Sequence, residues 1–143
     1  MWRVRIKQAG FTLLELLVVI SLIGLLVGVG TVSYTSAQKK SRDSRRKSDL
    51  KAVQNAFEQY YSDSSAVYPK DQTEAATALV GGLPTDPKNT GTYVYTVQYD
   101  ATDGAAYCAC GLLESDSGNA SALPGSTTCS WGTGSYFCVS NLQ

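Results

Sequence analysis

The sequence contains no histidine among its 143 residues. Histidine is the most common general base near neutral pH and the commonest metal ligand. Its absence therefore excludes many common types of catalytic and metal site. Phosphate-binding loops are missing as well, because neither the Gly81-Gly82 pair nor the later glycines match such a loop. We therefore expect a protein that is not an enzyme and that has no resident cofactor.

The four cysteines lack the spacing of a zinc site, since the Cys108-x-Cys110 pair is followed by wide gaps to Cys129 and Cys138. An even number of cysteines in a small domain is typical of disulfides. In a strand, Cys108 and Cys110 would share one face and would be too close along the chain to bond to each other without strain. Each is therefore expected to pair with Cys129 or Cys138, and the sequence leaves the two pairings open.

Lysine, arginine and proline are absent from residues 11–34, and the one charge in this run is Glu15. The run is long enough to cross the apolar layer of a bilayer, which is about 30 Å thick, as a helix. It is longer than the apolar core of an ordinary secretory signal, and only Thr35-Ser36-Ala37 weakly resembles a cleavage site after it. These features predict a transmembrane helix.

Glu15 is energetically unfavourable within such a helix. A carboxylate near the centre of the bilayer costs about 2.5–3.5 kcal/mol, and less near an end. Two explanations remain open for Glu15: its side chain reaches the interface, or it has a cationic partner.

Glycine and proline are also absent from residues 35–62, which predicts that the helix continues to about residue 62. Apolar residues recur at helical spacing near its end and predict a buried stripe of Leu50, Val53, Phe57, Tyr60 and Tyr61. Residues 39–47 carry basic side chains on every side of the helix, so we expect this section to be exposed in the monomer.

The rest of the chain predicts a small sheet. A short helix is expected at 74–80, and strands are expected at 92–99, 105–113 and 135–140, with a turn at Asp103-Gly104 and a loop at 114–127. The sheet must bury one face, and the nearest apolar surface is the helical stripe at residues 50–61. The predicted fold class is α+β, with a long N-terminal helix packed on a small antiparallel sheet.

The segment Lys7-Gln-Ala-Gly10-Phe11-Thr-Leu-Leu-Glu15 leads directly into the apolar run. This order of residues resembles the N-terminus of type IV pilins and of type II secretion pseudopilins, and weaker similarity to the pseudopilins continues through residues 83–87. The resemblance implies a pilin-like fold, cleavage between Gly10 and Phe11 by a prepilin peptidase, and methylation of Phe11. It also implies an assembly role for Glu15.

Four parts follow from the pattern and the resemblance together. They are a basic leader at 1–10, a transmembrane and assembly helix at 11–34, a continuing helix at 35–62 that is first exposed and then amphipathic, and a disulfide-containing β domain at 63–143 that packs on helix 50–62.

Charge is distributed unevenly along the chain. Residues 39–51 hold seven basic residues against two acids, whereas only two lysines oppose nine acids from residue 52 onward. Positive residues usually remain in the cytoplasm, and by this rule alone the C-terminal part would lie inside. Disulfides and the resemblance favour the opposite topology, with a single pass through the cytoplasmic (inner) membrane and the C-terminus outside.

The function that this reading predicts is a structural subunit of a type IV pilus-like or secretion-pseudopilus filament, found at the cell surface or in the envelope. Its expected partners are identical and related pilin subunits, the prepilin peptidase, an inner-membrane assembly platform, and membrane lipid before assembly. The alternative is a membrane-anchored extracytoplasmic ligand-binding domain held by an uncleaved signal anchor.

Two further ligands are weaker alternatives. Asp86, Asn89, Asp100 and Asp103 offer oxygen atoms of the kind that calcium prefers, and similar pseudopilins often hold calcium in a loop, although such residues also form plain turns. The basic residues 39–47 suggest nucleic acid, although charge runs on long helices are more often solvated or paired. Neither calcium nor nucleic acid is favoured.

Overall fold

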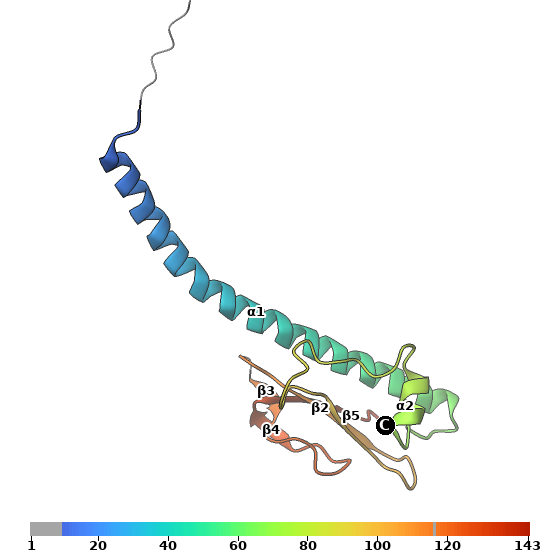
Figure 1. The fold of residues 1–143 in the computed structure, drawn as a ribbon. Coiled ribbons are helices and arrows are strands. Elements are labelled where there is room, and N and C mark those ends of the chain that lie inside the picture. Colours follow the sequence, from blue (N-terminus) through green and yellow to red (C-terminus); the bar gives the residue numbers. More distant parts are fainter. Residues whose placement is uncertain (1–9, 116) are drawn as a thin grey trace, which may run out of the picture. The chain divides into compact units, whose positions relative to one another are not determined.

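The computed structural model describes residues 10–115 and 117–143, without the side chains of residues 30 and 32 (Figure 1). Of the expected leader at 1–10, only Gly10 therefore lies within the described residues. The chain divides into two compact units, the first ending at Ala37 and the second running from Gln38 to Gln143. Helix α1, Leu13–Asp63, contributes residues to both units, and its bounds confirm the prediction of one uninterrupted helix.

The second unit contains a five-stranded antiparallel sheet with the strand order β1-β2-β5-β3-β4. Its strands are β1 (Thr96–Tyr99), β2 (Tyr107–Leu112), β3 (Gly118–Ala120), β4 (Trp131–Gly134) and β5 (Tyr136–Ser140). One long helix on a small antiparallel sheet confirms the predicted α+β fold class.

The sequence predicted three strands, and the described part of the structure has five. Strand β3 lies inside the predicted loop at 114–127, and β4 follows that loop. Both strands are rich in glycine and polar residues and lack alternating apolar side chains, so their composition indicated a loop. Glycine is needed here because a Cβ atom at Gly118 would collide with the backbone of Tyr136 in the neighbouring strand β5.

The core of this unit lies between α1 and the sheet. Leu50, Val53 and Phe57 are buried on α1, and they pack with residues of β2 and β5 that include Tyr107. The rings of Phe57 and Tyr107 meet edge to face, with 4.8 Å between their centroids. The predicted apolar stripe is thus confirmed at Leu50, Val53 and Phe57, whereas Tyr60 and Tyr61 are half-buried.

A second helix and a tight turn complete the unit. Helix α2, Gln72–Ala78, begins two residues earlier than predicted because the side chain of Asp71 caps it, accepting hydrogen bonds from the backbone of Thr73 and Glu74. The turn between β1 and β2 contains Gly104, whose φ of 65° favours glycine. Its carbonyl accepts a 2.8 Å hydrogen bond from the backbone N–H of Tyr68 and so joins this turn to the segment after α1.

The prediction that residues 39–47 are exposed on every side was wrong. Asp43 and Arg46 are fully buried in the second unit. Their burial is possible because acidic side chains from distant parts of the chain converge on them, and these partners are part of the candidate site described below.

Candidate functional site

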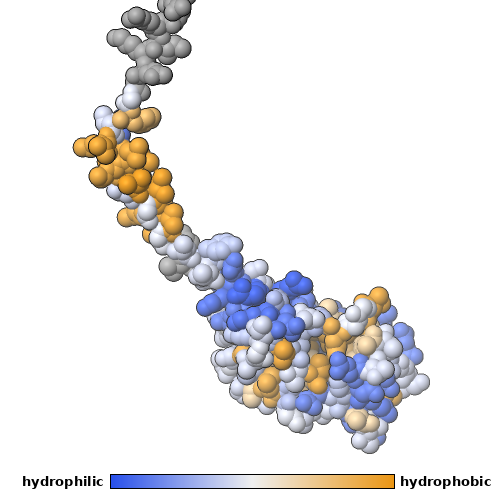
Figure 2. Space-filling model, viewed as in Figure 1, coloured by the Kyte–Doolittle hydropathy of each residue, from blue (hydrophilic) through white to orange (hydrophobic). Residues whose placement is uncertain are grey.

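The first unit exposes a continuous apolar surface. The large apolar side chains from Phe11 to Val29 are between 48% and 90% exposed, and Figure 2 shows them on the visible side of α1. By length and composition this part of α1 is able to cross a membrane. A monomeric soluble protein rarely exposes so large an apolar patch, so the surface requires lipid or other apolar helices around it.

Thr12 and Glu15 form a reciprocal cap at the start of α1. The carboxylate of Glu15 accepts hydrogen bonds from the backbone N–H of Thr12 at 2.9 Å and from its hydroxyl at 2.8 Å. In return, the backbone N–H of Glu15 donates to the hydroxyl of Thr12 at 3.3 Å. This is the capping box of the pattern Thr-x-x-Glu, and it satisfies polar groups at the helix end that would otherwise lack partners.

The predicted cleavage site lies directly before this cap. Gly10 and Phe11 are exposed and precede the first helical residue, Leu13. The side chain of Phe11 is 85% exposed, and open space surrounds the position of a Cβ atom at Gly10. The Gly10-Phe11 peptide bond is therefore accessible and is not part of the helix.

In the second unit, the buried guanidinium of Arg46 is held by three carboxylates. It donates to both oxygens of Asp86, at 2.7 and 3.0 Å, and to one oxygen each of Asp43 and Glu114, at 2.8 and 2.9 Å. Arg42 donates two further hydrogen bonds, both 2.7 Å long, to Glu114. We call these five residues, Arg42, Asp43, Arg46, Asp86 and Glu114, the ion cluster.

The carboxylates of the ion cluster also accept backbone hydrogen bonds. Asp43 accepts from the N–H groups of Glu114 and Ser115, both at 2.8 Å, and Asp86 accepts from the N–H of Lys88 at 2.8 Å. The cluster therefore fixes two loops to α1, one around residue 86 and one after β2. These hydrogen bonds allow the charged side chains of Asp43, Arg46, Asp86 and Glu114 to be buried together, while the side chain of Arg42 is 30% exposed at the edge of the cluster.

These contacts hold the acidic residues in their charged form. Hydrogen bonds from Arg42 lower the pKa of Glu114 to about 2, against the smaller opposing effect of burial. Burial alone would raise the pKa values of Asp43 and Asp86, but the N–H donors and Arg46 outweigh it and lower both. Burial would likewise lower the pKa of Arg46, and its three carboxylate partners raise it instead.

An aromatic ring covers the ion cluster. The guanidinium carbon of Arg46 lies 4.9 Å from the ring centre of Tyr93, and the ammonium of Lys88 lies 3.9 Å from the same centre. Both are cation–π distances. The nearby hydroxyl of Tyr95 donates to Asp49 at 2.8 Å, and burial raises the pKa of this tyrosine.

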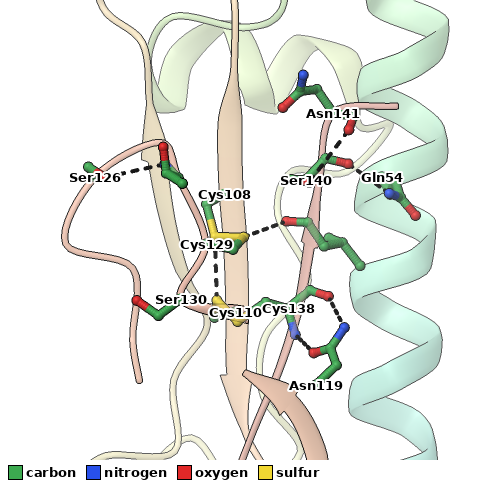
Figure 3. Close-up of a disulfide and its surroundings, with 12 residues drawn as sticks. Gln54, Cys108, Cys110, Asn119, Ser126, Cys129, Ser130, Cys138, Ser140 and Asn141 are labelled. Carbon is green, nitrogen blue, oxygen red and sulfur yellow. Dashed lines mark hydrogen bonds between the residues drawn. A yellow bond between two sulfur atoms is a disulfide. The ribbon is translucent and has the colours of Figure 1, made fainter. Parts of the chain in front are cut away.

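Two disulfides connect the strands of the sheet to the loop before β4 and to each other. Cys108 bonds to Cys129, and Cys110 bonds to Cys138 (Figure 3). Neither residue of the Cys108-x-Cys110 pair bonds to the other, as the sequence predicts. Beside them, the side chain of Asn119 in β3 exchanges two hydrogen bonds with the backbone of Cys138 in β5, as Figure 3 also shows.

The calcium alternative finds no support. Within residues 10–115 and 117–143, the one group of metal-ligating side chains close enough to share an ion is the four cysteines, and these are bonded in pairs. Asp86 belongs to the ion cluster. Asp100 accepts hydrogen bonds from backbone N–H groups of residues 102, 103 and 105 and so forms a turn.

Two features of the site escaped the sequence prediction. The capping box had a readable signal, because Thr12 precedes Glu15 by three residues at the start of a helix. The ion cluster had only a partial signal, since Asp43 and Arg46 are three residues apart on a helix whereas Asp86 and Glu114 come from remote loops.

Comparison with known proteins adds independent support. Residues 5–31 match the family described as "Prokaryotic N-terminal methylation motif". Fimbrial protein EcpC of Eikenella corrodens is 32% identical, over 95% of this chain and 85% of that protein. Type II secretion system core protein G of Vibrio cholerae is 33% identical, over 57% of this chain and 54% of that protein.

Type IV major pilin protein PilA of Myxococcus xanthus is also 33% identical, over 40% of this chain and 26% of that protein. The chain thus spans about half of the secretion protein and about a quarter of the major pilin, but most of the fimbrial protein. No solved structure matches the chain. The N-terminal motif and the match along nearly the whole fimbrial protein show that this chain belongs to the family of type IV pilins and type II secretion pseudopilins.

Proposed function

We propose that the chain is a structural subunit of a pilus-like or secretion-pseudopilus filament and that its work is mechanical. The observation that carries this proposal is the exposed apolar surface of α1 directly behind an accessible Gly10-Phe11 bond. Such a surface is stable in lipid, and it is equally stable among copies of the same helix. Both the membrane state and the filament state therefore use the same residues.

In this proposal the precursor spans the inner membrane once, with its second unit outside. A prepilin peptidase removes residues 1–10, and the new N-terminal Phe11 is methylated. An assembly platform in the inner membrane then transfers α1 from lipid into the filament. The second unit, with two disulfides, suits an oxidising compartment outside the cytoplasm.

Glu15 has a proposed role in assembly that the capping box makes more specific. Cleavage creates a cationic amino group on Phe11, and an incoming subunit brings this group beside Glu15 of its neighbour. In the monomer one oxygen of the Glu15 carboxylate accepts two hydrogen bonds from Thr12, which lower the cost of placing this carboxylate in the membrane without a cation. Pairing with the neighbour's amine replaces these hydrogen bonds, and we expect it to select the register more than to add stability.

The first test is the mass of the mature N-terminus together with imaging of filaments in cells that contain the peptidase. The proposal predicts loss of residues 1–10, a methylated Phe11, and filaments. The Gly10→Val variant is expected to keep the leader and to form no filaments. A mature chain that retains residues 1–10 would instead support the uncleaved, membrane-anchored ligand-binding domain.

Substitutions at Glu15 test the assembly role. Glu15→Ala and Glu15→Gln are expected to leave insertion and cleavage largely intact while incorporation into filaments falls sharply, because the charge that pairs with the amine is lost. Thr12→Val is the matched control, since it removes the hydroxyl of the capping box but keeps the carboxylate. Filaments of both Glu15 variants that match those of the original chain would rule out the pairing.

The nucleic-acid alternative is weakened by the ion cluster. Two of the basic residues that suggested it, Arg42 and Arg46, are bound to carboxylates of the same chain. Fewer cations are therefore available for phosphate contacts than the sequence alone implies.

A further inference from the structure

One end of the second unit exposes cations that the ion cluster does not use. Lys39 and Lys40 on α1 are exposed. The side chain of Arg45 is 69% exposed and lies 3.9 Å from Asp49, a loose ion pair. We call Lys39, Lys40 and Arg45 the basic end, and Figure 2 shows the hydrophilic colouring of this part of the molecule.

The other end of the unit carries a cleft with an acidic rim. Between the end of α1 and α2 lies a cleft of about 280 Å³, lined by Ala56, Gln59, Tyr60, Asp63, Thr77, Ala78 and Val80. Val80 is fully exposed there, and Asp63 is exposed without a charged partner among the described residues. The cleft thus combines apolar side chains, those of Ala56, Ala78 and Val80, with polar ones and the carboxylate of Asp63.

Two more exposed acids lie at the same end of the unit. Asp71 caps α2, and Asp103 lies in the turn that is bonded to the segment after α1. The nearby cation, Lys70, is half-buried and donates to the carbonyl of Thr102. We call Asp63, Asp71, Asp103 and the cleft the acidic end.

The two ends are too far apart to neutralise each other within one chain. Lys40 and Asp63 both lie on α1, 23 residues apart in the sequence, which corresponds to about 35 Å along a helix. The screening length is about 8–10 Å at physiological salt, so each end behaves as an isolated charge. Only a second molecule can bring the opposite charges together.

Both the aliphatic chain and the ammonium group of a lysine find suitable partners in the cleft. Its four methylene groups are apolar and pack well along alanine, tyrosine and valine surfaces, while its ammonium group remains near water. Asp63 on the rim offers the carboxylate that such an ammonium group needs. Charge complementarity therefore favours the basic end of another copy as the occupant of the cleft.

We infer that the second unit of one subunit binds, by its acidic end, the basic end of another copy of the same chain, with a lysine of α1 seated in the cleft beside Asp63. This inference rests on the proposed filament function and names the surfaces in contact. Contacts between opposite ends of identical subunits do not close on themselves unless the rotation forms a ring, so they extend into filaments. Copies in contact are displaced by about 35 Å along α1, the distance between the two ends.

Cross-linking in filaments of the full chain provides the direct test. A variant that combines Lys40→Cys with Asp63→Cys is expected to form a ladder of covalent multimers under oxidising conditions, because each copy carries both halves of the contact. Each single variant is the control and is expected to form no ladder. The ladder should disappear under reduction.

Charge reversal provides the second test. Asp63→Lys, and the double variant Lys39→Glu with Lys40→Glu, are each expected to lower the assembled fraction by at least about tenfold, since like charges then meet at the contact. Combining all three changes should restore much of the assembly. Asn55→Lys, which adds a charge at an exposed position of α1 outside the cleft, is the control and should assemble normally.

The outcomes separate the inference from the function on which it rests. Absence of filaments from the original chain would refute the proposed function itself. Filaments that form normally from both reversed variants, with no ladder from the double cysteine variant, would overturn the inference alone. If only the variant with Lys39→Glu and Lys40→Glu loses assembly, and it does so because it is no longer retained in the membrane, then the basic end binds anionic lipid. The inference is again overturned.

Discussion

Replacement of Arg46 by methionine tests whether the ion cluster holds the second unit together. The guanidinium is fully buried and makes four hydrogen bonds to three carboxylates. Without it, the carboxylates of Asp43 and Asp86 lose their cation and remain buried close to Glu114. Removing one partner from a buried ion pair typically costs about 3–5 kcal/mol, a large share of the 5–15 kcal/mol that keeps a domain folded.

The matched control is the same substitution at Arg45, the residue before Arg46. Arg45→Met removes an arginine from the same helix, but this side chain is 69% exposed and its acidic partner lies 3.9 Å away. Exposed pairs of this kind contribute about 0–1 kcal/mol. The two variants therefore remove the same chemical group and differ mainly in its burial and its partners.

Thermal unfolding of the full chain in a mild detergent, followed by the near-ultraviolet circular dichroism of its aromatic residues, measures the difference. Each kcal/mol lowers Tm by about 4–8 °C in a domain near this size, so Arg46→Met should lower Tm by at least about 12 °C and Arg45→Met by a few degrees at most. Adding Asp86→Asn to Arg46→Met should recover part of the loss, because the buried carboxylate of Asp86 loses its partner Arg46, whereas Glu114 keeps its hydrogen bonds from Arg42. Equal Tm values for the two methionine variants would refute the assigned role of the cluster.

Acid and thiol chemistry supply the remaining predictions. Because the pKa of Glu114 falls from 4.5 to about 2, its contribution to stability is complete above pH 4.5 and is lost as the pH falls through about 2. Urea midpoints should therefore drop over this window in the original chain and drop less in Glu114→Gln. Peptide mapping without reduction should recover the Cys108–Cys129 and Cys110–Cys138 links, and any other connectivity would contradict the structure. Cys129→Ser should cost about 3 kcal/mol, since the lost bridge closes a loop across 21 residues.

The sequence predicted those elements whose pattern is carried by apolar side chains. Helix α1 has no internal glycine or proline beyond residue 34, and its stripe at Leu50, Val53 and Phe57 indicated the face that packs on the sheet. Strands β1, β2 and β5 carry aromatic or β-branched residues and were expected. Strands β3 and β4 form because their glycines permit close backbone contact, which composition alone does not reveal.

The candidate site was predictable where its residues are close in sequence. Gly10, Phe11 and Glu15 form a short motif, and their places before and within the first turn of α1 follow from it. The burial of Arg46 was not predictable by the same route, because Asp86 and Glu114 reach it across 40 and 68 residues. The rule that a run of charges on a helix is exposed assumes that no opposite charges arrive from elsewhere, and here they do.

The two kinds of basic residue in this stretch suit two different tasks. The planar guanidinium groups of Arg42 and Arg46 make paired hydrogen bonds with carboxylates, a geometry that tolerates burial. The ammonium groups of Lys39 and Lys40 are strongly hydrated and remain at the surface, where they are available to another molecule. Loss of the buried Arg46 should therefore destabilise the second unit, whereas loss of the surface lysines should leave its stability unchanged and alter only its association.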